Sequence, residues 1–303
     1  MRVILLIFAM IWLSLANRTG AQDNAQLEIG GGKIDVIFSS APGETLRKLV
    51  LDWVASSARA VTVYYEQFPV SNLRIRVRLF EGRGVRGGQT TGWDGASITI
   101  AVGRSSSASD LSEDWELTHE MVHLAFPSVP EKHHWIEEGS ATYVEPIARA
   151  RAGDLTPEKV WGDLIDGLPK GLPQAGDRGL DFTPTWGRTY WGGALFCLLA
   201  DIEIRKRTGN KKGLEDALRA ILKAGGTIES EWPILRALEI GDRATGVPVL
   251  RELYDKMKGT SAPVDLSALW KELGVQRRNG KTEFNDRAPL APIRKAITQP
   301  VLR

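Results

Sequence analysis

The sequence predicts an α+β fold, in which a sheet-bearing N-terminal half precedes a mostly helical C-terminal half. Apolar and polar residues alternate, as they do in half-buried strands, at residues 33–39, 73–80 and 96–102. After residue 153 the apolar residues recur instead at a spacing of three and four, as in helices that bury one face. A chain of this length can bury a large core, in one elaborated domain or in two.

The first residues have the pattern of a signal peptide. Ser14 is the only polar residue between Val3 and Ala16, and this apolar run is too short for a comfortable membrane span. Residues 19–21 then offer a small-residue cleavage site. We therefore expect residues 1–21 to be a signal peptide and the protein to be exported, to the periplasm or the extracellular space. The alternative is an uncleaved N-terminal membrane anchor.

The net charge and the cysteine content of the chain argue against some classes of binding partner and against an internal disulfide. The chain has 39 Lys and Arg and 37 Asp and Glu residues; Arg2 and Arg18 lie in the expected signal peptide, so 39 − 2 = 37 basic residues balance the acidic ones. A protein without net charge offers no field that attracts nucleic acid. We expect no nucleic-acid partner and, after cleavage, no stable membrane span. The single cysteine, Cys197, cannot form an internal disulfide.

The remaining elements follow from the same patterns. Between the first two strands, residues 44–67 have the apolar periodicity of a helix. The second strand alternates apolar residues with Arg74, Arg76 and Arg78, which we expect on the solvent face of a sheet. Residues 82–95, before the third strand, are rich in glycine. The C-terminal half, residues 154–303, is expected to contain a hairpin turn at Asn279-Gly280 and helices near residues 189–208, 212–223, 230–240, 247–258, 264–273 and 291–298.

All four histidines lie between positions 119 and 134, and two of them belong to the motif His119-Glu120-x-x-His123. Residues four apart share a helix face, so both imidazoles can bind one metal ion. Glu120 lies beside them, where a carboxylate can activate a water on that ion. The alternative is that both histidines simply pack in a core.

The surroundings of this motif predict a helix. Asp110 is a good N-cap and Glu113, three residues later, completes a capping box, while Pro127 ends the apolar periodicity. We expect one helix of about fifteen residues with the histidines in its last two turns.

A zinc ion with two histidine ligands needs a third protein ligand. The candidates that follow the motif are Glu131, His133, His134, Glu137, Glu138 and Glu145. A second helix is expected from His134 to about Ala150, with Pro146 interrupting it late and Gly153 as its stop signal, and the small Gly139 and Ala141 are expected to let it approach the first helix closely.

Adjacent positions on this second helix differ by about 100° around its axis, so Glu137 and Glu138 point to different sides. Glu138 shares its side with the small Ala141, which must approach the first helix, whereas Glu137 shares its side with Ser140 and is expected at solvent or at the rim of the cleft. Glu138 is therefore the predicted third ligand.

These residues resemble a known family. The HExxH motif followed by Trp135-x-x-Glu138-Gly139-x-Ala141-x-Tyr143 is similar to the gluzincin metallopeptidases, above all to their leukotriene-A4-hydrolase, alanyl-aminopeptidase and glycyl-aminopeptidase branch. The resemblance implies a zincin-like subdomain over residues 22–153 and one zinc ion held by the two histidines and Glu138. It also implies that Glu145, seven residues further on, orients a ligand histidine.

The resemblance extends to a downstream segment and to the sheet. Thr189-Tyr190-Trp191-Gly192-Gly193-Ala194 is similar to the Tyr-x-Lys-Gly-Ala segment of the same branch, with Gly192 in place of the lysine. It implies that Tyr190 hydrogen-bonds the oxyanion of the reaction intermediate; the alternative is an aromatic residue that packs on the core. In gluzincins a sheet edge beside the zinc pairs with the substrate backbone, and residues 97–102 are expected to be that edge or, alternatively, an interior strand.

Together these features predict an exported zinc peptidase, acting on peptides or proteins in a cleft between the two halves. His119, His123 and Glu138 hold the ion; Glu120 takes the proton of the attacking water and passes it to the leaving amine; Tyr190 supports the oxyanion. One alternative is a non-catalytic, zinc-stabilised binding protein of the cell envelope. Another is an enzyme that hydrolyses a non-peptide bond.

Overall fold

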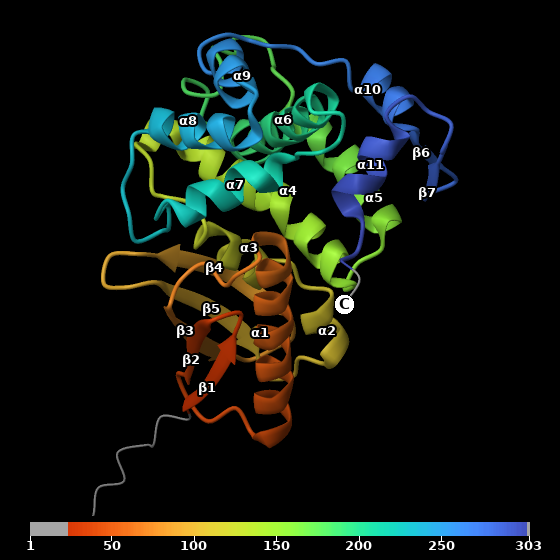
Figure 1. Ribbon diagram of the computed structural model, residues 1–303. Coiled ribbons are helices and arrows are strands. Elements are labelled where there is room, and N and C mark those ends of the chain that lie inside the picture. Colours follow the sequence, from red (N-terminus) through yellow and green to blue (C-terminus); the bar gives the residue numbers. More distant parts are fainter. Residues whose placement is uncertain (1–23, 302–303) are drawn as a thin grey trace, which may run out of the picture.

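The N-terminal half is built on a five-stranded mixed sheet with the strand order β1-β2-β3-β5-β4 (Figure 1). This computed structural model describes residues 24–301, so the expected signal peptide lies outside the described residues and export stays a prediction from the sequence. β2, β3 and β5 run parallel, and β1 and β4 are antiparallel to their neighbours at the two edges. The strands are β1 (Asn24–Ile29), β2 (Gly32–Phe38), β3 (Asn72–Phe80), β4 (Val85–Thr91) and β5 (Ser97–Gly103).

The two faces of this sheet differ as the sequence predicts. Val36, Ile75 and Ile98 lie side by side in register and are fully buried, on the face that packs against helix α1 (Glu44–Tyr65). On the other face Arg74, Arg76 and Arg78 of β3 are exposed to solvent. The expectation of a solvent-facing arginine row is confirmed.

The edge of the sheet is not where the sequence placed it. Residues 97–102 form β5, which is hydrogen-bonded to β3 on one side and to β4 on the other, so the expectation that they form the edge is wrong and the interior alternative is right. The edge is β4, which lies inside the glycine-rich stretch. Its sequence, Val-Arg-Gly-Gly-Gln-Thr-Thr, has no apolar alternation, because no residue of this strand is fully buried on either face.

The helix that was expected to run from Asp110 through the histidines is divided in two. α2 (Ala108–Ser112) is capped by Ser107 in a capping box with Asp110, so Asp110 lies inside the first turn instead of before it. The Asp114 carboxylate then accepts a hydrogen bond from the backbone N–H of Leu117 and starts α3 (Glu116–His123). This second helix-start contact, made by Asp114, accounts for the interruption. The motif still occupies the last two turns, as predicted.

Helix α4 (His134–Ala152) crosses α6 (Gly193–Arg207) at very close range. A Cβ atom on Gly139 would lie 2.3 Å from the Cα of Gly193, so the two backbones touch. The expectation that Gly139 lets α4 approach the histidine helix is therefore wrong, since this glycine faces α6. The expected interruption at Pro146 is also absent: α4 continues through it and ends at Gly153, whose φ of 88° is the left-handed conformation of a helix stop.

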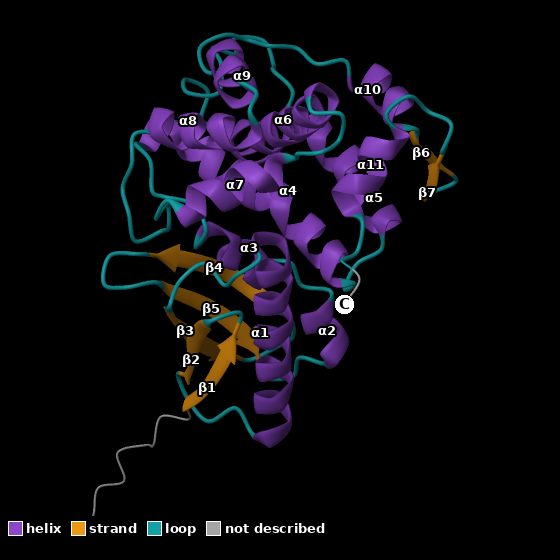
Figure 2. Ribbon diagram, in the orientation of Figure 1, coloured by secondary structure: helices purple, strands orange, loops and turns teal. Residues whose placement is uncertain are grey.

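The C-terminal half is mainly helical, as expected, and lies on one side of the sheet layer (Figure 2). The hairpin around Asn279-Gly280 forms as β6 and β7, and the last helix forms as α11. The elements are α5 (Pro157–Gly167), α7 (Leu214–Lys223), α8 (Ile234–Thr245), α9 (Val249–Met257), α10 (Leu266–Leu273), β6 (Val275–Arg278), β7 (Lys281–Phe284) and α11 (Ala291–Thr298).

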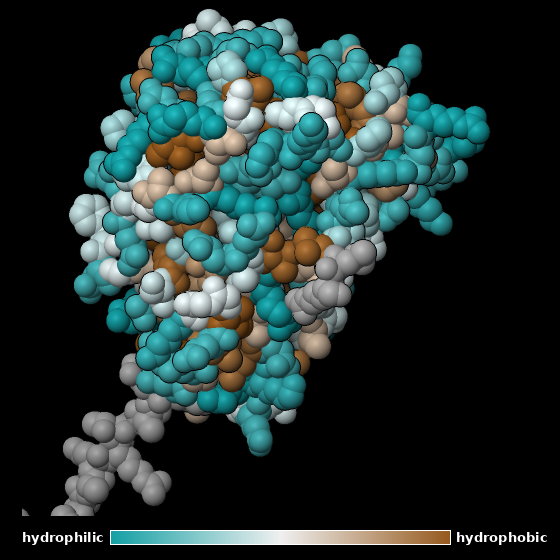
Figure 3. Space-filling model, in the orientation of Figure 1, coloured by the Kyte–Doolittle hydropathy of each residue, from teal (hydrophilic) through white to brown (hydrophobic). Residues whose placement is uncertain are grey.

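The face of the molecule drawn in Figure 3 is largely hydrophilic. In the view of Figure 3, polar side chains cover most of the molecule and hydrophobic residues show as separate patches. Among residues 24–301 no helix combines the length and the apolar character that a membrane crossing requires.

A buried charge network ties together α4, α6 and α7. Asp201 accepts hydrogen bonds from the Tyr143 hydroxyl at 2.8 Å and from Arg205 Nε at 2.7 Å. Arg205 and Arg151 both donate to Glu215, at 2.7 and 3.0 Å. Arg205 is buried, although it begins the basic run 205–207 at the end of α6, where solvent-exposed side chains would be expected. The spacing of helix residues alone does not reveal a counter-charge on another helix.

We expect Asp201→Ala to lower the free energy of unfolding by about 3–5 kcal/mol, because it removes one of the two carboxylates that neutralise the buried Arg205 and leaves the buried Tyr143 hydroxyl without its acceptor. Urea unfolding followed by circular dichroism measures this change. The control is Asp255→Ala, which removes an exposed ion pair with Arg251 and Lys258 and should leave the unfolding midpoint nearly unchanged. Equal effects of the two substitutions would contradict a special role of the buried network.

Candidate metal centre

Three side chains from two helices converge on one point. α3 supplies His119 and His123, and α4 supplies Glu138. The Nε2 atoms of the two histidines are 3.2 Å apart, and Glu138 Oε2 lies 3.2 Å from the first and 3.6 Å from the second. Bonds of about 2.0–2.1 Å to a tetrahedral metal put neighbouring ligand atoms about 3.3 Å apart. The three residues can therefore hold a metal ion, and two imidazoles with one carboxylate are a donor set that zinc takes.

The protonation of two of the three groups, His119 and Glu138, agrees with this role, whereas the carboxylates around His123 raise the pKa of that imidazole. Burial lowers the pKa of His119, which favours the neutral imidazole that a metal needs. Burial alone would raise the pKa of Glu138, but hydrogen bonds with His119, His123 and His134 bring it well below the usual value of a carboxyl group. Glu138 is thus held as a carboxylate.

Glu120 points into the same pocket but is held separately, by the edge strand. The Thr90 hydroxyl of β4 lies 2.5 Å from Glu120 Oε2, and it also lies 2.9 Å from the Glu120 carbonyl oxygen. A Cβ on Gly88 would lie 2.5 Å from Glu120 Cγ, so only glycine leaves room for this side chain. Gly87, in the left-handed conformation at a bulge in β4, sets the direction of the strand here. No pattern in the sequence indicates this contact between residues 30 apart.

Tyr190 also reaches the pocket. It lies in a π-helical turn, Gly187–Gly192, and its ring stacks on that of His119 with centroids 6.3 Å apart. Such wide turns are rare and are frequent at functional sites. Burial, together with the charge of Glu138, raises the pKa of the Tyr190 hydroxyl to about 12, so it is a proton donor at neutral pH. The structure thus brings together Tyr190, Glu120 and the three predicted ligands around a pocket of about 510 Å³.

The sequence matches no protein-family model and no curated protein. Among solved structures, an aminopeptidase N family protein from Idiomarina loihiensis is similar with a TM-score of 0.64 and 16% identity over 85% of this chain and 50% of that one. A variant of the M1 zinc metallopeptidase from Deinococcus radiodurans is similar with a TM-score of 0.50 and 16% identity over 80% of this chain and 52% of that one. This chain has the fold of the M1 zinc metallopeptidases. It spans about half the length of the two solved structures.

The shared M1 fold confirms the fold that the gluzincin resemblance implied, but one residue carried over from it, Glu145, has a different environment. Its carboxylate pairs with Arg149 at 2.8 Å, and Arg149 also donates to the backbone carbonyl of Ser112. Burial raises the pKa of Glu145 to about 7. Glu145 thus braces α2 against α4, and its partner among the described residues is an arginine instead of a ligand histidine.

The other candidate ligands lie around the site without joining it. His133 Nδ1 lies 3.0 Å from Asp181 Oδ1, facing away into the helical half. His134 Nδ1 is 2.8 Å from Glu137 Oε2, and its Nε2 is 3.3 Å from the second oxygen of Glu138. Glu137 accepts a hydrogen bond from the Val129 backbone at the pocket wall, consistent with its expected place at the rim. His134 thus holds the Glu138 carboxylate, a contact that was not predicted although the two residues are four apart on α4 and share a helix face.

Glu138→Ala should therefore abolish stoichiometric zinc binding, because two imidazoles alone hold the ion weakly. Glu137→Ala should keep about one equivalent of zinc, since its carboxylate binds only His134 and the Val129 backbone. Metal content after dialysis, measured by mass spectrometry, gives the answer, with circular dichroism to show that both variants fold. Tight zinc binding by the Glu138 variant, with loss in a His133 or His134 variant, would overturn the ligand set.

Proposed function

We propose that the chain is a zinc-dependent peptidase. The observation that carries the proposal is that Glu120 enters the pocket of the three donors without being one of them, held by Thr90. A zinc ion bound there would polarise the scissile carbonyl and make the attacking water more acidic. A structural zinc site normally has four protein ligands and has no use for an additional carboxylate. This argues against the non-catalytic binding protein.

The residues of the chain divide the remaining work. Glu120 takes the proton of the attacking water and delivers it to the leaving amine, as a carboxylate next to the reacting atoms can. The Tyr190 hydroxyl, protonated at neutral pH, donates a hydrogen bond to the oxygen on which negative charge develops. Gly87 to Thr90 of the edge strand line the pocket, and an extended substrate can pair with that strand through its main chain.

The test is the hydrolysis of a peptide mixture by zinc-loaded protein, with and without a chelator. Glu120→Gln should retain zinc and lose at least about a hundredfold in kcat, the contribution expected of a general base. Equal activity of this variant and the unaltered protein, at equal zinc content, would refute the proposal. Turnover of an ester or epoxide but of no peptide would favour the non-peptide alternative instead.

Tyr190→Phe should lower kcat about 10²–10³-fold with little change in KM, because the phenol bonds the developing oxyanion more strongly than the ground-state carbonyl. Steady-state kinetics on one good peptide separates the two constants. The phenylalanine keeps the ring stacked on His119, so zinc content should not change. A full loss of zinc, or a change in KM alone, would show that the tyrosine serves packing or binding instead.

A further inference from the structure

A second cavity, of about 1000 Å³, adjoins the metal pocket. Its walls come from α4, α5, the connection between α2 and α3, and the π-helical turn. Trp115 and Tyr190 line both cavities, so a molecule bound at the metal site can continue directly into the second one. Pockets of this size hold entire small ligands, so it has room for a bulky side chain and the backbone next to it.

Aromatic rings form a continuous wall from the metal ligand into this cavity. Trp115 meets the His119 ring edge-on at 5.2 Å, and on the other side Tyr190 stacks on His119. Trp186 in turn stacks on Tyr190 with centroids 5.9 Å apart. Trp115 and Trp186 are 49% and 62% exposed, an unusual state for tryptophan. Exposed rings beside a reaction pocket are surfaces that a ligand can cover.

Three carboxylates of the cavity wall are neutralised by ion pairs. Glu145 pairs with Arg149, Asp163 with Lys159, and Asp166 with Arg277. The remaining charged residues of the wall, Glu113, Asp154 and Lys170, lie at solvent-exposed positions, and the Lys170 ammonium lies over the Trp191 ring. A charged side chain entering the cavity would therefore find few free counter-charges in its interior. This favours an uncharged ligand group.

One polar atom of the wall has no partner. Among the described residues, the buried Thr142 Oγ1 of α4 makes no hydrogen bond, although it lines this cavity. A buried hydroxyl without a partner is destabilising, so a ligand that supplies one hydrogen bond is favoured there. The cavity thus combines aromatic walls with a buried hydroxyl that has no partner among the described residues.

Resting on the proposed peptidase function, we propose that this cavity is a substrate subsite that binds a large aromatic side chain next to the scissile bond. The ring would pack against Trp115 and Trp186, and the peptide group beside it would reach Thr142. Because Trp186 stacks on Tyr190, a side chain bound in the subsite would hold the substrate close to the hydroxyl that supports the oxyanion.

Binding to zinc-loaded Glu120→Gln protein tests this without turnover. The ligands are alanine-based peptides of one length in which Phe replaces Ala at each position in turn, and calorimetry gives each Kd. We expect one position at which Phe binds about tenfold more tightly than Ala, the gain from burying one ring against aromatic partners. Adding Trp186→Ala should reduce that preference to within about twofold, and Trp115→Ala should weaken it as well.

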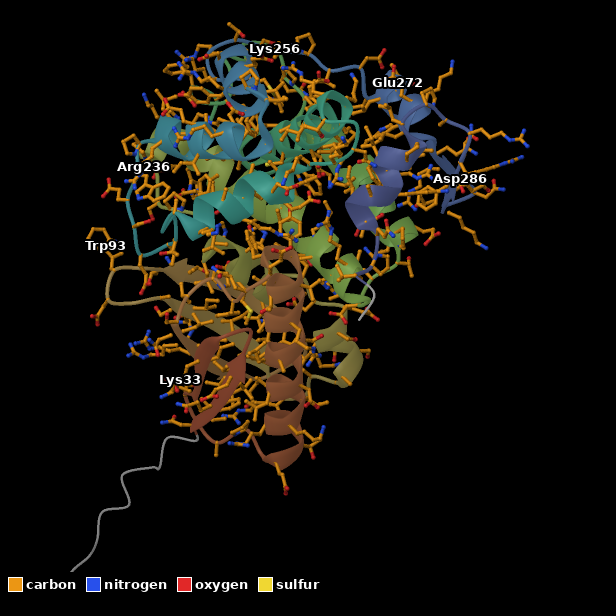
Figure 4. All side chains as sticks on the ribbon, viewed as in Figure 1. Lys33, Trp93, Arg236, Lys256, Glu272 and Asp286 are labelled. Atoms are coloured by element: carbon orange, nitrogen blue, oxygen red, sulfur yellow. The ribbon has the colours of Figure 1, made fainter. Side chains whose placement is uncertain are left out.

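Trp93→Ala is the matched control, because Trp93 is 99% exposed and lies at the outer end of the β4–β5 loop (Figure 4). It should keep the full preference. The subsite is refuted if no position prefers Phe, or if the preference survives both Trp186→Ala and Trp115→Ala. Hydrolysis of the all-alanine peptide by the unaltered protein reports on the peptidase proposal separately. Hydrolysis without a Trp186-dependent preference refutes the subsite alone, and the preference without hydrolysis refutes the peptidase alone.

Discussion

The backbone contact between Gly139 and Gly193 is the constraint on which the geometry of the site depends. A side chain at either position would collide with the opposite helix, at 2.3 Å from Gly139 and 2.0 Å from Gly193. Gly139 directly follows the ligand Glu138, and Gly193 begins α6, three residues after Tyr190. The contact therefore holds the π-helical turn against α4 next to the three candidate metal ligands. Stacking of Tyr190 on His119 follows from it.

Local sequence was sufficient for the parts of the site that lie on single helices. The spacing of four in the HExxH motif and the 100° step between Glu137 and Glu138 depend only on helix geometry, and the structure places the three predicted ligands together. The contact of Thr90 with Glu120 was not predictable in this way, because it joins an edge strand to a helix 30 residues away. An edge strand with two glycines has no periodicity that distinguishes it from a loop.

Helix geometry also explains why Glu145 does not orient a ligand histidine, as the family resemblance implied. Seven residues bring Glu145 back to the face of Glu138, but they also move it about 10 Å along the helix axis. At that distance it meets Arg149 instead of a ligand histidine. The burial of Asp201 and Arg205 could not be predicted from local patterns either. It depends on Tyr143 and Glu215, which lie on other helices.

His119 belongs both to the group of candidate metal ligands and to the aromatic wall that leads into the second cavity. The His119 Nε2 atom faces His123 and Glu138, while the His119 ring contacts the rings of Trp115 and Tyr190. An imidazole held between aromatic rings has little freedom to rotate, so the aromatic wall fixes the direction of the metal-binding nitrogen. The π-helical turn lets Trp186 and Tyr190 stack on each other along this wall. A molecule that packs against Trp186 is therefore separated from the candidate metal ligand His119 by only two stacked rings.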